Sequence, residues 1–186
     1  MRLGFVRVLS VCALLVAAAT AHAEENQFNR PGAFVGLGGV YGVSAFQGSA
    51  RDLFGNSLGF QARGGYRFNE IFAVEGIYEY MDNFGVKGVR DASIWTNNLT
   101  ANGKLILPLD RFQPYLSGGV GFLNAEPHGK GDGQWAFAGR FGGGTDVALT
   151  ENIALYLDAS YVIPAGGGAI SNVQYFSFGW GGKYLF

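Results

Sequence analysis

The sequence predicts an all-β protein, an eight-stranded antiparallel up-and-down transmembrane β-barrel. Three observations predict this fold. The N-terminus has the form of an export signal. The rest of the chain contains segments in which apolar and polar residues alternate. The connections between these segments are alternately long and short. Alternation with a period of two is typical of a β-strand whose two faces meet different surroundings.

The first 23 residues are predicted to be a cleaved signal peptide. Two arginines and no acidic residue open the chain, and an apolar stretch follows at residues 8–19. Ala21 and Ala23 then give the small-x-small pattern that signal peptidase cuts. The apolar stretch is shorter than the ~20 residues that a membrane-spanning helix needs. We therefore expect cleavage after Ala23 and a single barrel domain over residues 24–186.

The composition of residues 24–186 excludes several classes of protein. Eleven basic and 14 acidic residues remain once the two signal arginines are removed, so the net charge is −3 and does not favour nucleic acid as a partner. The 15% aromatic content argues against disorder. No window after Ala23 reaches 18 continuous apolar residues, which excludes spanning helices. The only cysteine, Cys12, lies in the signal peptide.

Eight segments with period-two alternation are the predicted strands. Each is near or above the 9 to 11 residues, roughly, that a tilted strand needs to cross a bilayer. Strands of soluble proteins are usually about 5 to 6 residues long, so an ordinary sandwich is disfavoured. The segments cover residues 33–46, 58–68, 71–81, 94–107, 112–123, 134–149, 153–163 and 174–186.

The connections between these segments alternate in length. In outer-membrane barrels the short turns face the periplasm and the long loops face outside, so both termini are expected in the periplasm. The long, polar, glycine-rich connections are residues 47–57, 82–93, 124–133 and 164–173. The short ones are residues 69–70, 108–111 and 150–152.

The two faces of the predicted strands differ in charge. One phase carries aromatic and aliphatic side chains such as Leu37, Tyr78 and Leu157. The other phase carries every charged residue within the strands and is otherwise filled largely by Gly, Ser and Gln. The nine charged residues are Arg63, Arg67, Glu75, Glu79, Lys104, Arg140, Asp146, Asp158 and Lys183.

Alternation alone leaves two orientations open. A soluble lipocalin-like barrel would turn the apolar phase inward. The signal peptide, the strand length and the rows of aromatic residues, which match interfacial girdles, favour the inverted arrangement with an interior charge network. An unpaired buried charge would cost several kcal/mol, so we expect the charges to pair. Arg63 and Glu75 fall opposite or one step apart in one hairpin and are an expected pair.

The last strand carries a second signal. Its alternating aromatic residues end in Phe186, the final residue. This pattern is similar to the terminal strand of outer-membrane β-barrels, which the barrel assembly machinery reads. The resemblance implies that Trp180, Tyr184 and Phe186 form an assembly signal.

A glycine-rich segment at residues 114–122 also resembles the fifth strand of small "porin family" barrels. These proteins are related to the membrane domain of outer membrane protein A and to the opacity adhesins. The resemblance implies a location in the outer membrane of a Gram-negative bacterium. The implied partners are membrane lipid and lipopolysaccharide, together with periplasmic chaperones and the assembly machinery during folding, and a monomer is expected.

Residues suited to catalysis or metal binding are few. His128, the only histidine outside the signal peptide, lies in a long loop, so a serine nucleophile would have no positioned base. One histidine and no cysteine also give no basis for a metal site, and the glycine clusters do not complete a phosphate-binding motif. The sequence therefore predicts no enzyme and no cofactor.

Three functions remain to be compared. The first is a structural or surface-interaction scaffold that presents extracellular loops. The second is a narrow channel or uptake conduit for small solutes, which the small width of an eight-stranded barrel disfavours. The third, a lipid-modifying enzyme, lacks a catalytic constellation in the sequence.

Overall fold

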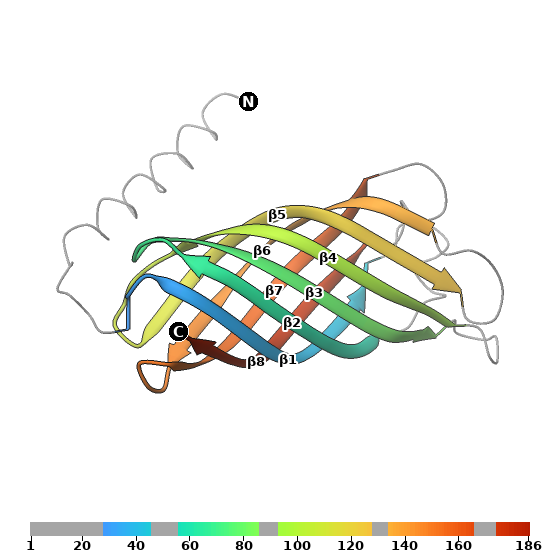
Figure 1. The fold of residues 1–186 in the computed structure, drawn as a ribbon. Coiled ribbons are helices and arrows are strands. Elements are labelled where there is room, and N and C mark those ends of the chain that lie inside the picture. The colour runs from blue at the N-terminus through green and yellow to red at the C-terminus, as the bar shows by residue number, and fades with distance from the viewer. Residues whose placement is uncertain (1–27, 46–55, 86–92, 128–133, 166–173) are drawn as a thin grey trace, which may run out of the picture.

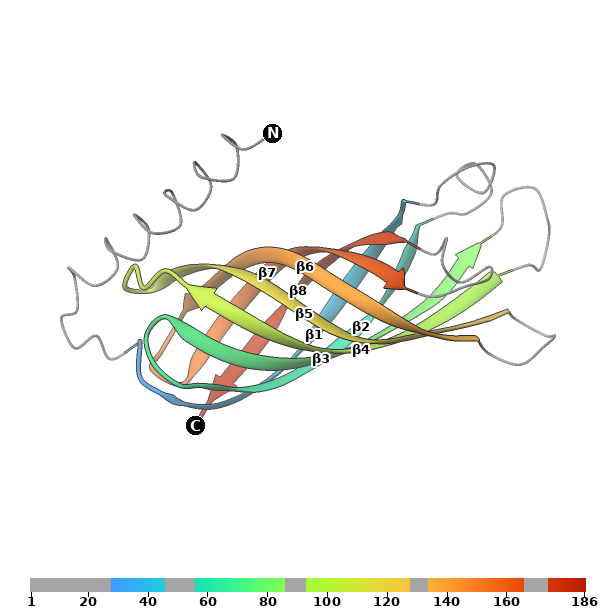
Figure 2. The ribbon, with the colours of Figure 1, turned by 90° about the horizontal axis from the view of Figure 1, so that it is seen from above.

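The computed structural model describes residues 28–45, 56–85, 93–127, 134–165 and 174–186. It is a closed β-barrel with long, tilted strands (Figure 1, Figure 2). The predicted signal peptide, including Ala21 and Ala23, lies outside the described residues, and so do His128 and most of the long connections. No membrane-spanning helix occurs in the part of the chain that is described.

Eight strands form the barrel, as the sequence predicts. Each strand pairs antiparallel with the next, and β1 pairs with β8 to close the sheet, which leaves no free edge. The strands are β1 (Gly32–Ser44), β2 (Ser57–Arg67), β3 (Phe72–Gly85), β4 (Ser93–Ile106), β5 (Phe112–Pro127), β6 (Gln134–Ala148), β7 (Ile153–Ala165) and β8 (Tyr175–Leu185).

The short turns all lie at one end of the barrel, here called the turn end, and the opposite end is called the loop end. Asn69 shapes the first turn, because its side-chain oxygen accepts hydrogen bonds from the backbone of Ile71 and Phe72. Asp110 shapes the second with a φ of 51°, a left-handed conformation that Asp tolerates. The start of β1 and the C-terminus lie side by side at the turn end (Figure 1).

Strands β3 and β5 are longer than the alternation predicts. The predicted ends were residues 81 and 123, whereas the strands run to Gly85 and Pro127. The pairing of β3 with β4 continues past a register shift between Met81 and Phe84. A strand that emerges from the lipid no longer needs an apolar outward phase, so its sequence stops alternating before its backbone pairing ends.

The outer face is apolar, as predicted. Leu37, Phe141 and Leu157 are each more than 60% exposed along the middle of the barrel. Aromatic residues form a belt around the barrel near each end. Ring contacts at the turn end include Tyr66–Phe68, Phe68–Phe72 and Tyr184–Phe186, and those toward the loop end include Phe60–Tyr80, Tyr80–Trp95, Phe122–Phe137 and Tyr161–Phe176. Two such belts correspond to the interfacial girdles of a transmembrane barrel.

Candidate functional site: the filled lumen

The inward phase of the strands brings the nine predicted charges into the lumen. Eight of the nine residues are buried, and the ninth, Asp146, has a side chain that is 15% exposed. Eight of the nine make ion pairs with one another. These eight residues, here called the charge ladder, are Arg63, Glu75, Glu79, Lys104, Arg140, Asp146, Asp158 and Lys183.

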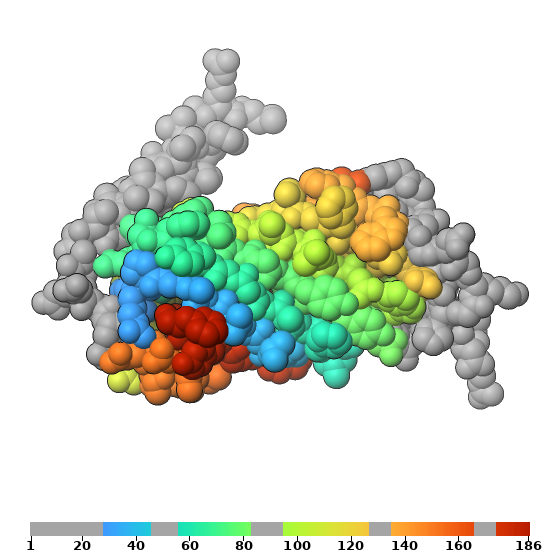
Figure 3. All heavy atoms as spheres, viewed as in Figure 1, coloured from blue at the N-terminus to red at the C-terminus, as the bar shows by residue number. Residues whose placement is uncertain are grey.

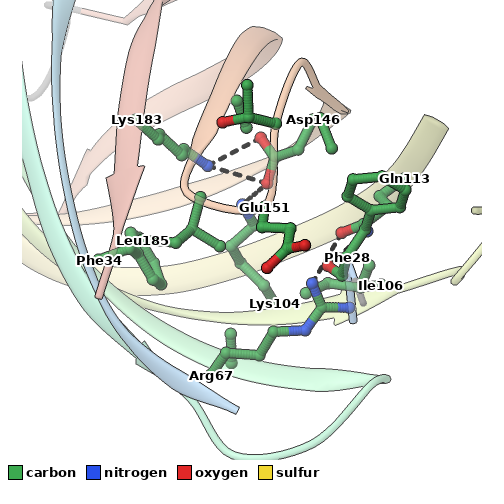
Figure 4. A pocket seen from close by; sticks show the side chains of 14 residues that line it. Phe28, Phe34, Arg67, Lys104, Ile106, Gln113, Asp146, Glu151, Lys183 and Leu185 are labelled. Atoms are coloured by element: carbon green, nitrogen blue, oxygen red, sulfur yellow. Dashed lines mark hydrogen bonds and ion pairs between the residues drawn. The ribbon is translucent and has the colours of Figure 1, made fainter. Parts of the chain in front are cut away.

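The ladder starts at the turn end with two lysines that share two carboxylates. Lys183 Nζ lies 2.8 Å and Lys104 Nζ lies 3.2 Å from oxygens of Asp146 (Figure 4). The same two ammonium groups lie 3.4 and 3.7 Å from Glu75 Oε2. Glu75 therefore connects the lysines to the next step of the ladder.

Two arginines continue the ladder toward the loop end. Arg63 contacts Glu75 at 3.5 Å and Asp158 at 2.5 Å. Asp158 also lies 3.5 Å from Arg140, whose guanidinium reaches Glu79 at 2.8 Å. The ladder thus holds four cations and four anions in one connected set, so its own charges balance.

Inward glycines make room for these long side chains. A Cβ atom at Gly179 would overlap Gln61 and Asp158, and one at Gly181 would overlap the Tyr156 hydroxyl. These glycines of β8 leave room for inward side chains of the adjacent strand β7 and of β2, which lies on the other side of β1. The glycine content of the sequence thus has a specific packing role here.

Two inward tyrosines hold the cations of the ladder. The Arg63 guanidinium lies 4.0 Å from the ring centroid of Tyr156, and Lys104 Nζ lies 3.6 Å from that of Tyr115. Both are cation–π distances. Neither tyrosine was predicted from the sequence as part of the network, although both lie on the inward phase of their strands.

Two details of the predicted charge network need correction. Arg67 makes no ion pair among the described residues. Instead, its guanidinium donates to Gln113 Oε1 and to the carbonyl oxygens of Asn69 and Glu70. It therefore braces the first turn. Arg63 and Glu75 do contact each other, but diagonally, because Glu75 pairs with Gly65 in the register.

The rest of the inward phase is also more apolar than predicted. Gly, Ser and Gln were expected there, yet two apolar clusters lie on either side of the ladder. The loop-end cluster is Val40, Met81, Leu123, Ala125, Ala136, Ala138, Val162 and Tyr175. The turn-end cluster is Phe34, Ala73, Ile106 and Tyr115, with Leu185 packed against it. The charges are therefore enclosed between two apolar layers.

The predicted assembly residues lie on the outer surface of the barrel, two of them on β8 and Phe186 directly after it. Trp180, Tyr184 and Phe186 are 43%, 47% and 67% exposed. The Trp180 ring covers Gly39 of the neighbouring strand so closely that a Cβ there would clash with it. At the turn end, the C-terminal residues adjoin the first residues of β1 on the surface (Figure 3). All three side chains thus face the surroundings of the barrel, where another protein can reach them.

Among the described residues, no group of three or more His, Cys, Asp or Glu side chains could hold a metal ion. The lumen carboxylates are each in contact with at least one cation. Their arrangement favours charge pairing over catalysis.

The sequence matches the family described as outer membrane protein beta-barrel domain over residues 9–183. A search of curated protein sequences found no match. Solved structures similar to this barrel include the Neisserial surface protein A, with 18% identity, a TM-score of 0.67 and coverage of 84% of this chain and 99% of that one.

Two further structures show the same fold. The attachment invasion locus protein Ail of Yersinia pestis has 14% identity and a TM-score of 0.55, and the match covers 84% of this chain and 97% of that one. The outer membrane protein OprG of Pseudomonas aeruginosa has 17% identity and a TM-score of 0.57, with 87% and 99% covered. At these identities the likeness concerns the fold.

Proposed function

Since the chain belongs to the outer membrane protein beta-barrel domain family, we propose that this outer-membrane protein is a closed scaffold that presents its long loops at the cell surface. The observation that carries the proposal is the filled lumen, in which the charge ladder lies between two apolar clusters. The turn end faces the periplasm and the loop end faces outside.

The lumen leaves little space for a water column. An eight-stranded barrel is only wide enough for side chains to fill it. An ion that crossed would have to separate several buried pairs and pass two apolar layers, and each separated charge would lose its partner in a region with little water. A stable open pore is therefore unfavourable in this arrangement.

Single-channel recording tests the closed lumen. Purified mature protein inserted into planar bilayers should show no steady open state, and at most rare, brief openings. Detergent added without protein is the control for bilayer artefacts. A steady, large wild-type conductance would reject the closed scaffold and put the channel function first.

The loops are the part of the scaffold that we expect to meet partners. Two of the structural neighbours are described as a surface protein and as an attachment invasion protein, which supports a role in surface contacts. We also propose that the protein is a monomer surrounded by membrane lipid and lipopolysaccharide. Its last strand is then the signal that the assembly machinery recognises. No catalytic role is proposed.

Surface presentation can be tested with single cysteines, because the mature chain is expected to have none. A large, impermeant maleimide should label Lys130→Cys, in a long connection, on intact cells. It should label Glu151→Cys, in a turn-end hairpin, only after the cells are broken. The reverse pattern would mean that the barrel is oriented the other way.

A further inference from the structure

Two residues before the first strand are packed into the turn end of the barrel. Phe28 and Asn29 are 8% and 5% exposed, although they precede the first paired residue, Gly32. Gln113 Nε2 donates to Phe28 O at 3.0 Å and to Asn29 Oδ1 at 2.8 Å. The Arg111 guanidinium lies 5.0 Å from the Phe28 ring centroid. The segment is therefore held by specific contacts.

A small cavity lies beneath this segment. Its volume is about 30 Å³, and Phe28, Gln113, Lys104, Asp146 and Lys183 are among the residues that line it (Figure 4). That is room for about one water molecule. The cavity thus places Phe28 directly between the periplasmic end and the lysine step of the charge ladder.

The other side of the ladder is closed differently. Toward the loop end, Val40, Met81, Leu123 and Val162 are fully buried in the apolar cluster, and each belongs to a strand that pairs with both of its neighbours in the closed sheet. Removing that closure would require moving the wall of the barrel. Residues 28 and 29 lie outside the sheet, so their release needs only a few local contacts to break.

We propose that Phe28 and Asn29 form a removable plug of the periplasmic mouth. When the plug is docked, it covers Lys104 and Lys183, whose side chains are 1% and 4% exposed, and most of Asp146. When it leaves, water and small solutes reach Lys104, Asp146 and Lys183 while the barrel stays folded. This goes beyond the scaffold function, which needs no removable part.

A cysteine inside the cavity reports on the plug. Ala154 lines the cavity and is 5% exposed, so Ala154→Cys in otherwise wild-type mature protein should react slowly with a small thiol reagent. Adding Phe28→Ala and Asn29→Ala should raise the labelling rate by at least about tenfold, because only the local closure is lost. Arg30→Ala is the matched control, since Arg30 is the next residue but is exposed, and it should leave the rate unchanged.

A second reporter separates plug release from loosening of the barrel. Ala138→Cys lies in the fully buried loop-end cluster and should stay protected in every background. Equal Ala154→Cys rates with and without the plug residues would overturn the proposal. Faster labelling of Ala138→Cys would overturn it as well, because the whole barrel would then be opening. If the double variant does not fold, Gln113→Ala removes the anchor instead and should give the same selective increase.

Discussion

Replacing Leu157 with arginine is expected to destabilise the folded barrel by about 2 to 4 kcal/mol in lipid vesicles, the range for a charge at the lipid midplane of such barrels. Leu157 lies near the middle of β7, opposite Trp180, and its side chain points outward with 61% exposure. In this position the guanidinium would face hydrocarbon, where it finds neither water nor an acidic partner.

The same substitution at the turn end is the matched control. Leu109 is 51% exposed in the second turn, beyond the apolar middle of the barrel, so Leu109→Arg should cost about 0 to 1 kcal/mol. The free energy of unfolding is measured by urea titration of vesicle-bound protein. Equal losses for the two variants would show that the outward face of β7 does not lie in lipid.

The fold was predictable because a barrel strand has only two faces. Alternation assigns each residue to the lipid or to the lumen, and this sufficed to place all nine charges on the inward side. Alternation does not report where a strand ends once it has left the membrane. For that reason the ends of β3 and β5, at Gly85 and Pro127, were predicted too early.

The contacts within the lumen were less predictable, because they depend on barrel closure. Arg63 and Asp158 are 95 positions apart in the chain and meet only because β2 and β7 face each other across the lumen. Alternation also gives no depth along the barrel axis, so it could not show that inward apolar residues gather in layers above and below the charges. Phe28 and Asn29 lie outside any alternating segment and gave no signal.

The charge ladder predicts that the same substitution has different effects at a buried and at an exposed glutamate. Glu75→Gln should destabilise the barrel by about 3 to 5 kcal/mol, the range for breaking a buried pair. Glu75 has a side chain that is 1% exposed and lies within 3.7 Å of three cations, those of Arg63, Lys104 and Lys183. Its neutral replacement leaves the ladder with four cations and three carboxylates in a lumen that holds little water.

Glu151→Gln is the same chemical change in an exposed pair. Glu151 lies 3.9 Å from Arg30, with side chains that are 52% and 46% exposed, so water screens the charges and the loss should stay at or below about 1 kcal/mol. Urea titration in vesicles measures both variants. Similar small losses at the two sites would mean that the ladder is hydrated and that the lumen is not sealed.

A double variant separates charge imbalance from lost packing. Lys104→Gln added to Glu75→Gln leaves the ladder with three cations and three anions, so its charges balance again. The losses in the free energy of unfolding caused by the two single substitutions should therefore not add. A coupling of roughly 0.5 to 3 kcal/mol should appear in the double-mutant cycle. Lys104 is a suitable choice because its ammonium group also contacts Asp146 at 3.2 Å, so the single change leaves that carboxylate with Lys183 as a partner. Strict additivity would indicate that the two residues stabilise the barrel only through their individual packing, and the ladder would then have no role as a balanced unit.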